Sequence, residues 1–455
     1  MIQFDQLQQQ VLAVVRANPP KNLVLRDCVG AVLAEPILAT VDLPPFDNSA
    51  MDGYAVRAAD VTNLPVTLRV VGVSSAGHPA DCTVGAAEAA RILTGAVMVQ
   101  GADTVVRVED TQPAASPHSP DTQSLDTQSP DTQSLDTQSP DTQSLDTQSP
   151  DTQSLDTHSP DTHSPEMQIS EAPSEFVVIT AAPAPGANIR RAGEAARTGD
   201  ELVAAGTVLN PGHLGLAASA GCRELMVIER PRVAVLSTGD ELLPPGAGQL
   251  EPGQIFESNS TVLAALARSM GCEVTTHHCM DDAASLRTLL MELAGSHQLI
   301  LSSGGVSMGG EYDSMRQAVA GFDVEFLKIA IRPAKPMAFG RIEESILFGL
   351  PGNPVSSVVA FELFVRPAIR QISGLAPALP PLIHGVAGEQ LPRLAGEFTY
   401  MLSTRQDPQG DWVSTGGFGS HVLGGIAHAQ ALAVIPPGPE PVAKGSDLHL
   451  IPLWS

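Results

Sequence analysis

A short apolar run in the middle of the chain is followed by a turn rich in glycine and serine, at residues 301–313 (LSSGGVSMGGEYD). Residues 299–301 have the pattern of a buried strand, and residues 313–320 that of a helix. Such a turn leaves backbone N–H groups free at the helix start, where the helix dipole also favours an anion. We therefore predict a phosphate or oxyanion cradle made by Ser302, Ser303, Gly304 and Gly305.

Acidic residues follow the strand predicted at residues 233–236, in the sequence Thr238-Gly239-Asp240-Glu241. Two carboxylates repel a naked phosphate, but they suit a divalent cation that bridges to it, and Mg²⁺ commonly binds through one or two carboxylates plus substrate phosphates. For Asp240, capping of the following turn is an equally good interpretation.

A second acidic pair, Asp281 and Asp282, precedes a helix predicted at residues 283–294. We expect one of these acids to be the N-cap of the helix and the other to face a ligand.

Three cations, Lys328, Arg332 and Lys335, recur at offsets of four and three residues in the run 326–336. On a strand bent by prolines they can converge on one anion, although a solvated strand edge is the alternative. A fourth loop, at Pro351, Gly352 and Asn353, also follows an apolar strand. One Gly-rich turn is a weak signal, but four loops in succession at the ends of apolar strands favour a site for anionic ligands.

Other chemistries find less support in the sequence. Cys272, His277, His278 and Cys279 lie close together, but their spacing matches no zinc-binding pattern. The sequence has no context typical of a Ser/His/Asp triad and no Walker P-loop.

The length and composition of the chain limit the number of domains and the kinds of partner that we expect. With 455 residues, the chain is expected to form three or four domains. Its formal net charge is −25, partly because nine Asp residues recur at five-residue spacing from Asp121 to Asp161. The rest is still net negative and has no basic stripe, so we expect no nucleic-acid partner.

The five cysteines are scattered and include no CxxC pair, which fits free thiols in a reducing compartment. The first 15 residues lack the basic start and long apolar core of a signal peptide. No apolar run reaches the roughly 18 residues of a membrane span. The sequence therefore predicts a cytoplasmic protein that does not enter a membrane.

The hydrophobic pattern divides the chain into parts with different periodicities. Residues 4–15 are spaced as an amphipathic helix, and short alternating runs at 66–73, 91–93 and 105–108 predict a small β domain. Strand and helix patterns alternate from 233 to 372, which indicates a parallel sheet with helices on both faces and ligands beyond the carboxyl ends of its strands. After Pro377 the pattern is β-like again.

Residues 119–165 repeat SPDTQ and SLDTQ almost perfectly. With almost no apolar content, the repeat cannot offset the entropy of ordering, so we interpret it as a disordered insertion in a loop of the β domain. A passive loop is the plainer interpretation, and an arm that binds a partner is the alternative.

Seven motifs occur along the chain: DNSAMDGYAVR at 47–57, RILTGA at 91–96, GADTVVRVED at 101–110, LSTGDEL at 236–242, SSGGVSMG at 302–309, KIAIRPAKP at 328–336 and GLPGNPVS at 349–356. Together they resemble the molybdopterin molybdenumtransferase family, the MoeA type that includes the E domain of gephyrin. The resemblance covers nearly the whole chain except the repeat.

The resemblance implies an α/β multidomain fold with four parts. These are a split α+β first domain at 1–48 and 186–229, a small β domain at 49–185 with the repeat insertion at about 112–170, a three-layer α/β domain with a parallel sheet at 230–376, and a C-terminal β-barrel-like domain at 377–455. It also implies a homodimer whose active cleft lies between the third domain of one subunit and the first two domains of the other.

The implied activity is insertion of molybdate into adenylylated molybdopterin, with Mg²⁺ as cofactor and release of AMP. A molybdopterin adenylyltransferase and molybdoenzymes are the implied protein partners. Two alternatives stay open: adenylylation of molybdopterin by the third domain, and a catalytically weak scaffold in cofactor assembly.

The resemblance also assigns residues to the site. Those implied for catalysis are Asp52, Thr94, Glu241, Lys328, Arg332 and Lys335; those for the nucleotide, phosphate or pterin are Asp240, Ser302, Ser303, Gly304, Gly305, Pro351, Gly352, Asn353, Arg190 and Ser420; those for the metal are Glu241, Asp281, Asp282 and Asp313. The chain departs from the family pattern at Arg332, where Lys is usual, at Ala334, where Gly is usual, and at Ala195, where Asp is common. It also holds one extra residue near Gly310, and Arg405 is the available substitute for a family Arg near Tyr400.

Overall fold

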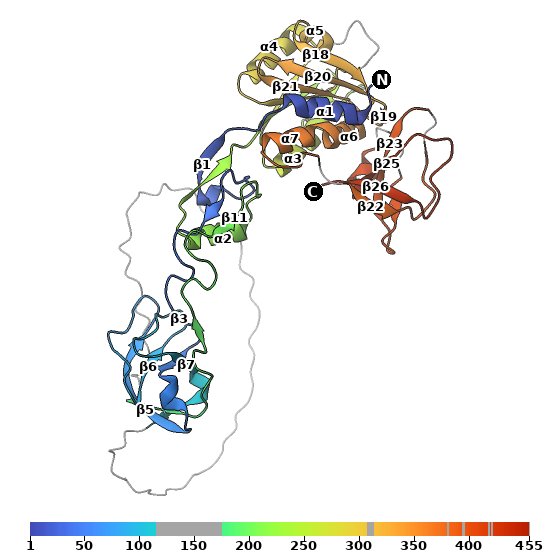
Figure 1. The fold of residues 1–455 in the computed structure, drawn as a ribbon. Coiled ribbons are helices and arrows are strands. Elements are labelled where there is room, and N and C mark those ends of the chain that lie inside the picture. Colours follow the sequence, from blue (N-terminus) through green and yellow to red (C-terminus); the bar gives the residue numbers. More distant parts are fainter. Residues whose placement is uncertain are drawn as a thin grey trace, which may run out of the picture. The chain divides into compact units, whose positions relative to one another are not determined.

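The structure, a computed structural model, describes residues 1–114, 175–306, 314–379, 382–393, 396–416, 419 and 422–454. These residues form two compact units, one of residues 42–195 and one of residues 1–41 together with 196–455 (Figure 1). The fold is α/β and multidomain, as predicted. The predicted boundaries of the four domains stay a prediction, and the repeat lies outside the described residues.

A six-stranded sheet is the centre of the larger unit. Its order is β16 (Glu273–Cys279), β13 (Arg232–Thr238), β17 (Leu299–Ser303), β21 (Ser345–Leu350), β20 (Pro336–Ile342) and β18 (Asp323–Lys328). The first four strands are parallel, but β20 is antiparallel to both β21 and β18. The predicted parallel sheet is confirmed for these four strands, and the sheet continues at this edge with two antiparallel pairings that the prediction did not include. No helix separates β18, β20 and β21 in the chain, so they can pair only as hairpin-type neighbours.

Alternate residues of the central strands face two different layers. Val233 and Val235 of β13 pack in one apolar cluster, whereas Ala234 and Leu236 pack in another. Successive side chains of a strand point to opposite faces, so both faces of the sheet are buried.

The two layers are made by different helices. The first cluster takes in side chains of α1 (Phe4–Val14), α3 (Asn259–Ser269), α6 (Pro354–Ala360), the π-helical turn η4 (Phe361–Val365) and α7 (Arg366–Ile372). The second takes in α4 (Ala283–Ala294) and α5 (Ser314–Ala318). The helices predicted at 283–294 and, apart from its π-helical turn, at 355–372 are confirmed.

The N-terminal residues of the larger unit form small two-stranded sheets with a later stretch of the chain. β1 (Pro20–Val24) pairs with β12 (Glu224–Ile228), and β2 (Ile37–Leu38) pairs with β11 (Glu201–Val203). The 3₁₀ turn η1 (Leu25–Asp27) and helix α2 (Pro211–Ser219) complete this part. Asn210 caps α2 by accepting a hydrogen bond from the His213 N–H at 2.9 Å.

The C-terminal residues form a second six-stranded sheet. Its order is β19 (Ile331–Arg332), β23 (Thr399–Gln406), β25 (Ala431–Ile435), β26 (Asp447–Pro452) and β22 (Ile383–Val386), with β24 (Trp412–Ser414) paired to β23. The remaining elements of the larger unit are helix α8 (Leu423–Ala427) and the short parallel pair of β14 (Leu242–Leu243) and β15 (Ile255–Phe256). β19 lies between β18 and β20 in the chain but pairs with β23. The single bent strand predicted for the cationic run 326–336 is therefore wrong.

The smaller unit is a β domain, as predicted. Its sheet has the order β7 (Thr104–Arg107), β4 (Gly53–Val56), β6 (Glu88–Ile92), β5 (Val66–Ser74), β9 (Phe176–Ile179) and β8 (Thr111–Ala114); β3 (Asn48–Ser49) pairs with β10 (Ile189–Arg190), and η2 (Ala58–Val61) and η3 (Val108–Asp110) are 3₁₀ turns. Gly53 is required in β4, because a Cβ there would collide with the Val106 carbonyl of β7.

No helix among the described residues is long and apolar enough to cross a membrane. All five cysteines are free thiols. Burial raises the pKa of the Cys272 thiol to about 12.

We expect Cys272 to resist alkylation at about pH 8, where only about one thiol in ten thousand is the reactive thiolate. Cys222, which is half-buried, serves as the internal reference. Iodoacetamide labelling of the native protein followed by peptide mass spectrometry measures both rates. Equal labelling of the two thiols before unfolding would contradict the assigned burial.

Candidate functional site

A cavity of about 720 Å³ lies at the carboxyl ends of the central parallel strands. It is lined by the loops that follow β13, β17 and β21, by the cationic run and by the C-terminal sheet, through Glu241, Gly304, Gly305, Val306, Arg332, Pro333, Ala334, Lys335, Pro336, Pro351, Gly352, Asn353, Ser356, Pro392 and Tyr400. Three of the four predicted loops thus meet with the cationic run at the edge of the sheet where a doubly wound fold binds its ligands.

The glycines of the predicted cradle line the cavity, but its serines do not. Gly304 has φ +98°, and a Cβ there would lie 2.9 Å from the Thr238 carbonyl oxygen, so this position needs glycine. Ser302 and Ser303 are buried in β17. The Ser302 hydroxyl is buried without a hydrogen-bond partner among the described residues, as is the Thr238 hydroxyl.

Asn259, the first residue of α3, ties two of these loops together. Its Nδ2 donates to the Ser303 hydroxyl at 2.6 Å and to the Gly352 carbonyl at 2.7 Å. The loop after β17 and the loop after β21 therefore hold a fixed spacing. Sequence reasoning missed Asn259, because only the packing of α3 against the sheet brings it to these loops.

Glu241 is the acidic residue on the cavity wall. Gly239 makes room for it, because a Cβ at Gly239 would collide with the Glu241 carboxylate. A carboxylate at the rim of a basic cavity is a hard oxygen ligand of the kind that Mg²⁺ takes together with substrate phosphates.

Two of the three predicted cations, Arg332 and Lys335, line the cavity. Both lie over the ring of Phe398, with the Arg332 Cζ at 4.6 Å and the Lys335 Nζ at 5.1 Å from its centroid. These distances are in the range of cation–π contacts, so Phe398 positions both charges. Lys328 is at the exposed end of β18 and is not among the lining residues.

Between the two cations, Ala334 has φ +79°, a left-handed conformation that glycine adopts without cost. An alanine there is strained by about 1–2 kcal/mol. The pairing of β19 with the C-terminal sheet holds this turn in place.

The other predicted acids lie beside the cavity rather than on its wall. The Asp281 N–H donates to Asp240 Oδ1 at 3.0 Å, so Asp240 joins two strand ends instead of capping its own turn. Asp282 is the N-cap of α4 and accepts from the Ser285 N–H at 2.8 Å, as predicted for one acid of the pair. Hydrogen bonds from Ser285 hold the pKa of Asp282 below its ordinary value.

The described residues contain no group of three or more His, Cys, Asp or Glu side chains that could hold a metal by themselves. Asp313, the fourth predicted metal ligand, lies outside the described residues, and so does Ser420.

In the smaller unit, Asp52 and Thr94 form one hydrogen-bonded pair. Asp52 Oδ1 accepts from the Thr94 N–H at 2.7 Å and from the Thr94 hydroxyl at 2.8 Å. These bonds, with the nearby charge of Arg91, hold the pKa of Asp52 below its ordinary value. Asp52 is therefore a fixed anion at neutral pH. Arg190 is an exposed residue of the short strand β10 in this unit.

Comparison with known proteins assigns the chain to a family. Residues 2–221 match the N-terminal region of MoeA (domains I and II), and residues 234–371 match the family described as "Probable molybdopterin binding domain". A curated relative, molybdopterin molybdenumtransferase 2 of Mycobacterium tuberculosis, is 34% identical over 97% of both chains. The chain belongs to the molybdopterin molybdenumtransferase family.

Other relatives of the family agree with this assignment. The molybdopterin molybdenumtransferase of a Nostoc species is 32% identical over 93% of this chain and 86% of its own. The crystal structure of the molybdopterin biosynthesis MoeA protein from Pyrococcus horikoshii has the same fold, with a TM-score of 0.70, 22% identity and 99% of both chains covered.

Proposed function

We propose that this chain inserts molybdate into adenylylated molybdopterin with release of AMP, the molybdenum-transfer step of molybdenum cofactor biosynthesis. The relative from Mycobacterium tuberculosis that shares 34% identity over 97% of both chains is named molybdopterin molybdenumtransferase 2. The observation that carries the proposal for this chain is the cavity itself, where Arg332, Lys335 and Gly304 surround one space at the strand ends.

The groups in and around the cavity have roles that follow from their charge and their hydrogen bonds. Molybdate and the diphosphate of the adenylylated substrate are both anions, and they repel each other in water. Arg332 and Lys335 offset their charge in the cavity, and the glycine loop at Gly304 offers backbone N–H groups instead of side chains. Asn259 keeps the loops around this space at a fixed spacing.

The donor set of the cavity fits Mg²⁺. Glu241 supplies one carboxylate on the cavity wall, and oxygens of the substrate diphosphate would supply further ligands. Bound there with the substrate diphosphate, Mg²⁺ would neutralise charge and polarise the phosphoryl oxygens.

The assay that tests the activity is AMP release from adenylylated molybdopterin by the purified full chain, with Mg²⁺ and micromolar molybdate. We expect AMP to form only when molybdate is present. A folded protein that releases no AMP would refute the transfer. Consumption of ATP without molybdate would instead indicate an adenylyltransferase.

We further propose that the enzyme is a cytoplasmic homodimer that receives its substrate from a molybdopterin adenylyltransferase and delivers cofactor to molybdoenzymes. In this proposal, the Asp52–Thr94 pair of one subunit completes the cavity of its partner. Asp52 is ionised and exposed. Both properties are needed if its carboxylate is to act on a ligand that is bound in the cavity of the partner subunit.

A heterodimer of two inactive variants tests the shared site. One subunit carries Asp52→Ala and the other Glu241→Gln, and two different affinity tags allow its isolation. We expect about half of the wild-type activity, because one of the two sites then contains neither substitution. Each variant homodimer is the control. A heterodimer as inactive as its parents would place both residues in a site made by one chain.

We expect Phe398→Leu to weaken molybdate binding by about threefold to tenfold, because Arg332 and Lys335 lose the ring face that positions them. Phe398→Tyr keeps an aromatic face and is the matched control. Calorimetric titration with molybdate measures the difference. If the leucine and tyrosine variants bind equally, the ring does not position these cations.

A further inference from the structure

A second cavity, of about 350 Å³, lies in the larger unit and shares no lining residue with the first. Four arginines line it: Arg230 from the link between β12 and β13, Arg268 from the last turn of α3, and Arg366 and Arg370 from α7. We call it the arginine pocket. In a chain with 25 basic and 50 acidic residues, four guanidinium groups around one small space are unexpected.

Three of these arginines have no carboxylate partner in the part of the chain that the structure describes. Arg230, Arg268 and Arg370 form no salt bridge with any residue that the structure describes. Arg230 donates from Nη2 to the carbonyls of Asp27 and Val29, at 3.3 and 3.0 Å. Arg370 donates only to carbonyls as well, those of Ala378 and Pro377. Their charges are held in place but not neutralised.

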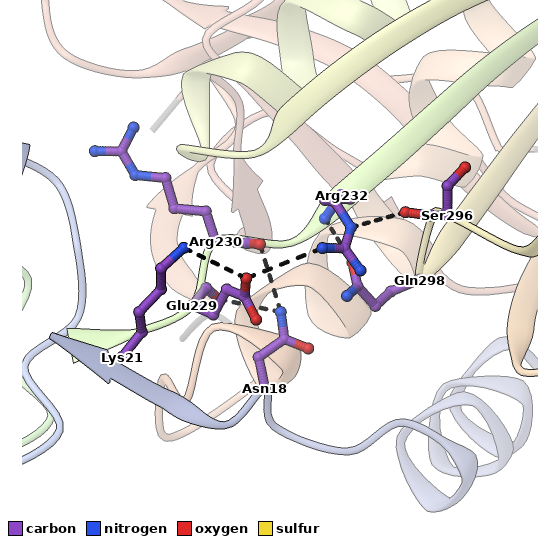
Figure 2. Close-up of polar contacts among 7 residues, drawn as sticks. All are labelled: Asn18, Lys21, Glu229, Arg230, Arg232, Ser296 and Gln298. Atoms are coloured by element: carbon purple, nitrogen blue, oxygen red, sulfur yellow. Dashed lines mark hydrogen bonds and ion pairs between the residues drawn. The ribbon is translucent and has the colours of Figure 1, made fainter. Parts of the chain in front are cut away.

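Glu229 is the one acidic residue among the described residues that line the arginine pocket, and its carboxylate is turned elsewhere. Its Oε1 lies 3.8 Å from the Lys21 Nζ and 3.9 Å from the Arg232 Nη1. Figure 2 shows this carboxylate directed at Lys21 and Arg232, while the Arg230 guanidinium extends away from it. Glu229 therefore does not neutralise the pocket.

Within the described ranges, Arg366 is the one arginine of the pocket with a carboxylate partner. Its Nη2 donates to Glu362 Oε1 at 2.9 Å, and its Nε donates to the other carboxylate oxygen. Even so, burial together with the charge of Arg366 lowers the pKa of Arg370. Positive charge is thus in excess at the α7 wall.

The plainer interpretation is that cations favour the ends of helices, and Arg268 and Arg370 are indeed in last turns. A helix end offers only about half a negative charge, and it explains neither Arg230 nor the cavity. The remaining walls are largely apolar and include Ile228, Ile369 and Leu375. Arg366 also directly follows the π-helical turn η4, a feature frequent at functional sites.

We propose that the arginine pocket binds a small phosphate monoester, with the phosphate among the guanidinium groups and the organic part on the apolar wall. Guanidinium forks match the oxygens of phosphate and carboxylate alike. The excess of charge favours the doubly charged phosphate over a single carboxylate. The volume is within the range of small-molecule sites.

Calorimetric titration of the full chain with phenyl phosphate tests this proposal, with inorganic phosphate and phenol as the two halves of the probe. We expect saturable binding of phenyl phosphate, weaker binding of phosphate and none of phenol. Arg268 is exposed, so we expect the Arg268→Gln variant to stay folded and to bind the probe about tenfold more weakly. The double variant with Arg268→Gln and Arg370→Gln is expected to bind it more weakly still.

Two controls separate this site from other cations. Arg223→Gln removes an exposed arginine outside the pocket, and Lys335→Gln removes a cation of the first cavity, so neither should change the affinity that Arg268→Gln weakens. The proposal is overturned if millimolar phenyl phosphate does not bind, or if Arg268→Gln and the pair bind it as the wild type does. A change of molar mass by light scattering in the Arg268→Gln variant, without an effect on phosphate binding, would assign the pocket to a protein contact and overturn it too.

Discussion

Glu241→Gln is expected to lower the rate of AMP release by about a thousandfold while the protein stays folded. The substitution keeps the size of the side chain and removes its charge, so the cavity loses the one carboxylate that the described residues place on its wall but none of its packing. The diphosphate of the substrate then meets Arg332 and Lys335 without the acid that would hold Mg²⁺ beside them. Steady-state assays at saturating molybdate, with circular dichroism as the check on folding, measure this effect.

Glu251→Gln is the matched control, because Glu251 is an exposed acid that follows Glu241 in the chain but lies between β14 and β15, outside the cavity wall. We expect it to retain wild-type turnover. If the Glu241 variant is as active as the Glu251 variant, Glu241 has no part in the chemistry, and the acid at this cavity is only a surface charge.

The second large effect is on stability. Glu362→Ala is expected to lower the free energy of unfolding of the larger unit by about 3–5 kcal/mol. Glu362 is 1% exposed and Arg366 is 5% exposed, and the carboxylate accepts hydrogen bonds from the Nε and Nη2 of that arginine. Alanine removes both acceptors and leaves the guanidinium in the apolar layer under the central sheet.

Urea unfolding followed by far-UV circular dichroism measures this loss. Glu362→Gln keeps one acceptor and should cost less than alanine, whereas Glu292→Ala on the exposed face of α4 should cost almost nothing. A Glu362→Ala protein as stable as the Glu292 variant would mean that the buried pair contributes nothing to the fold.

The sequence predicted those parts of the site that local patterns encode. The apolar run before Gly304 and the acid before α4 are local signals, and the structure has a buried strand at the first and a capped helix at the second. The loops of Glu241, Gly304 and Gly352 meet because parallel strands place their carboxyl ends at one edge.

The other parts of the site and of the central sheet depend on strand pairing between distant parts of the chain. Arg332 and Lys335 reach the cavity while Lys328 does not, because β19 leaves the central sheet and pairs with β23. That pairing also brings Phe398 to the two cations. The order of β18, β20 and β21 likewise follows from hairpin pairing, which the alternation of strand and helix patterns does not reveal.

A crystal of the full chain soaked in tungstate tests the central claim most directly, because tungsten replaces molybdenum in the oxyanion and is located by its anomalous scattering. We predict a peak in the first cavity, within hydrogen-bond distance of Arg332 or Lys335 and of the Gly304 loop. A peak only in the arginine pocket or on the outer surface, with this cavity empty, would contradict the account.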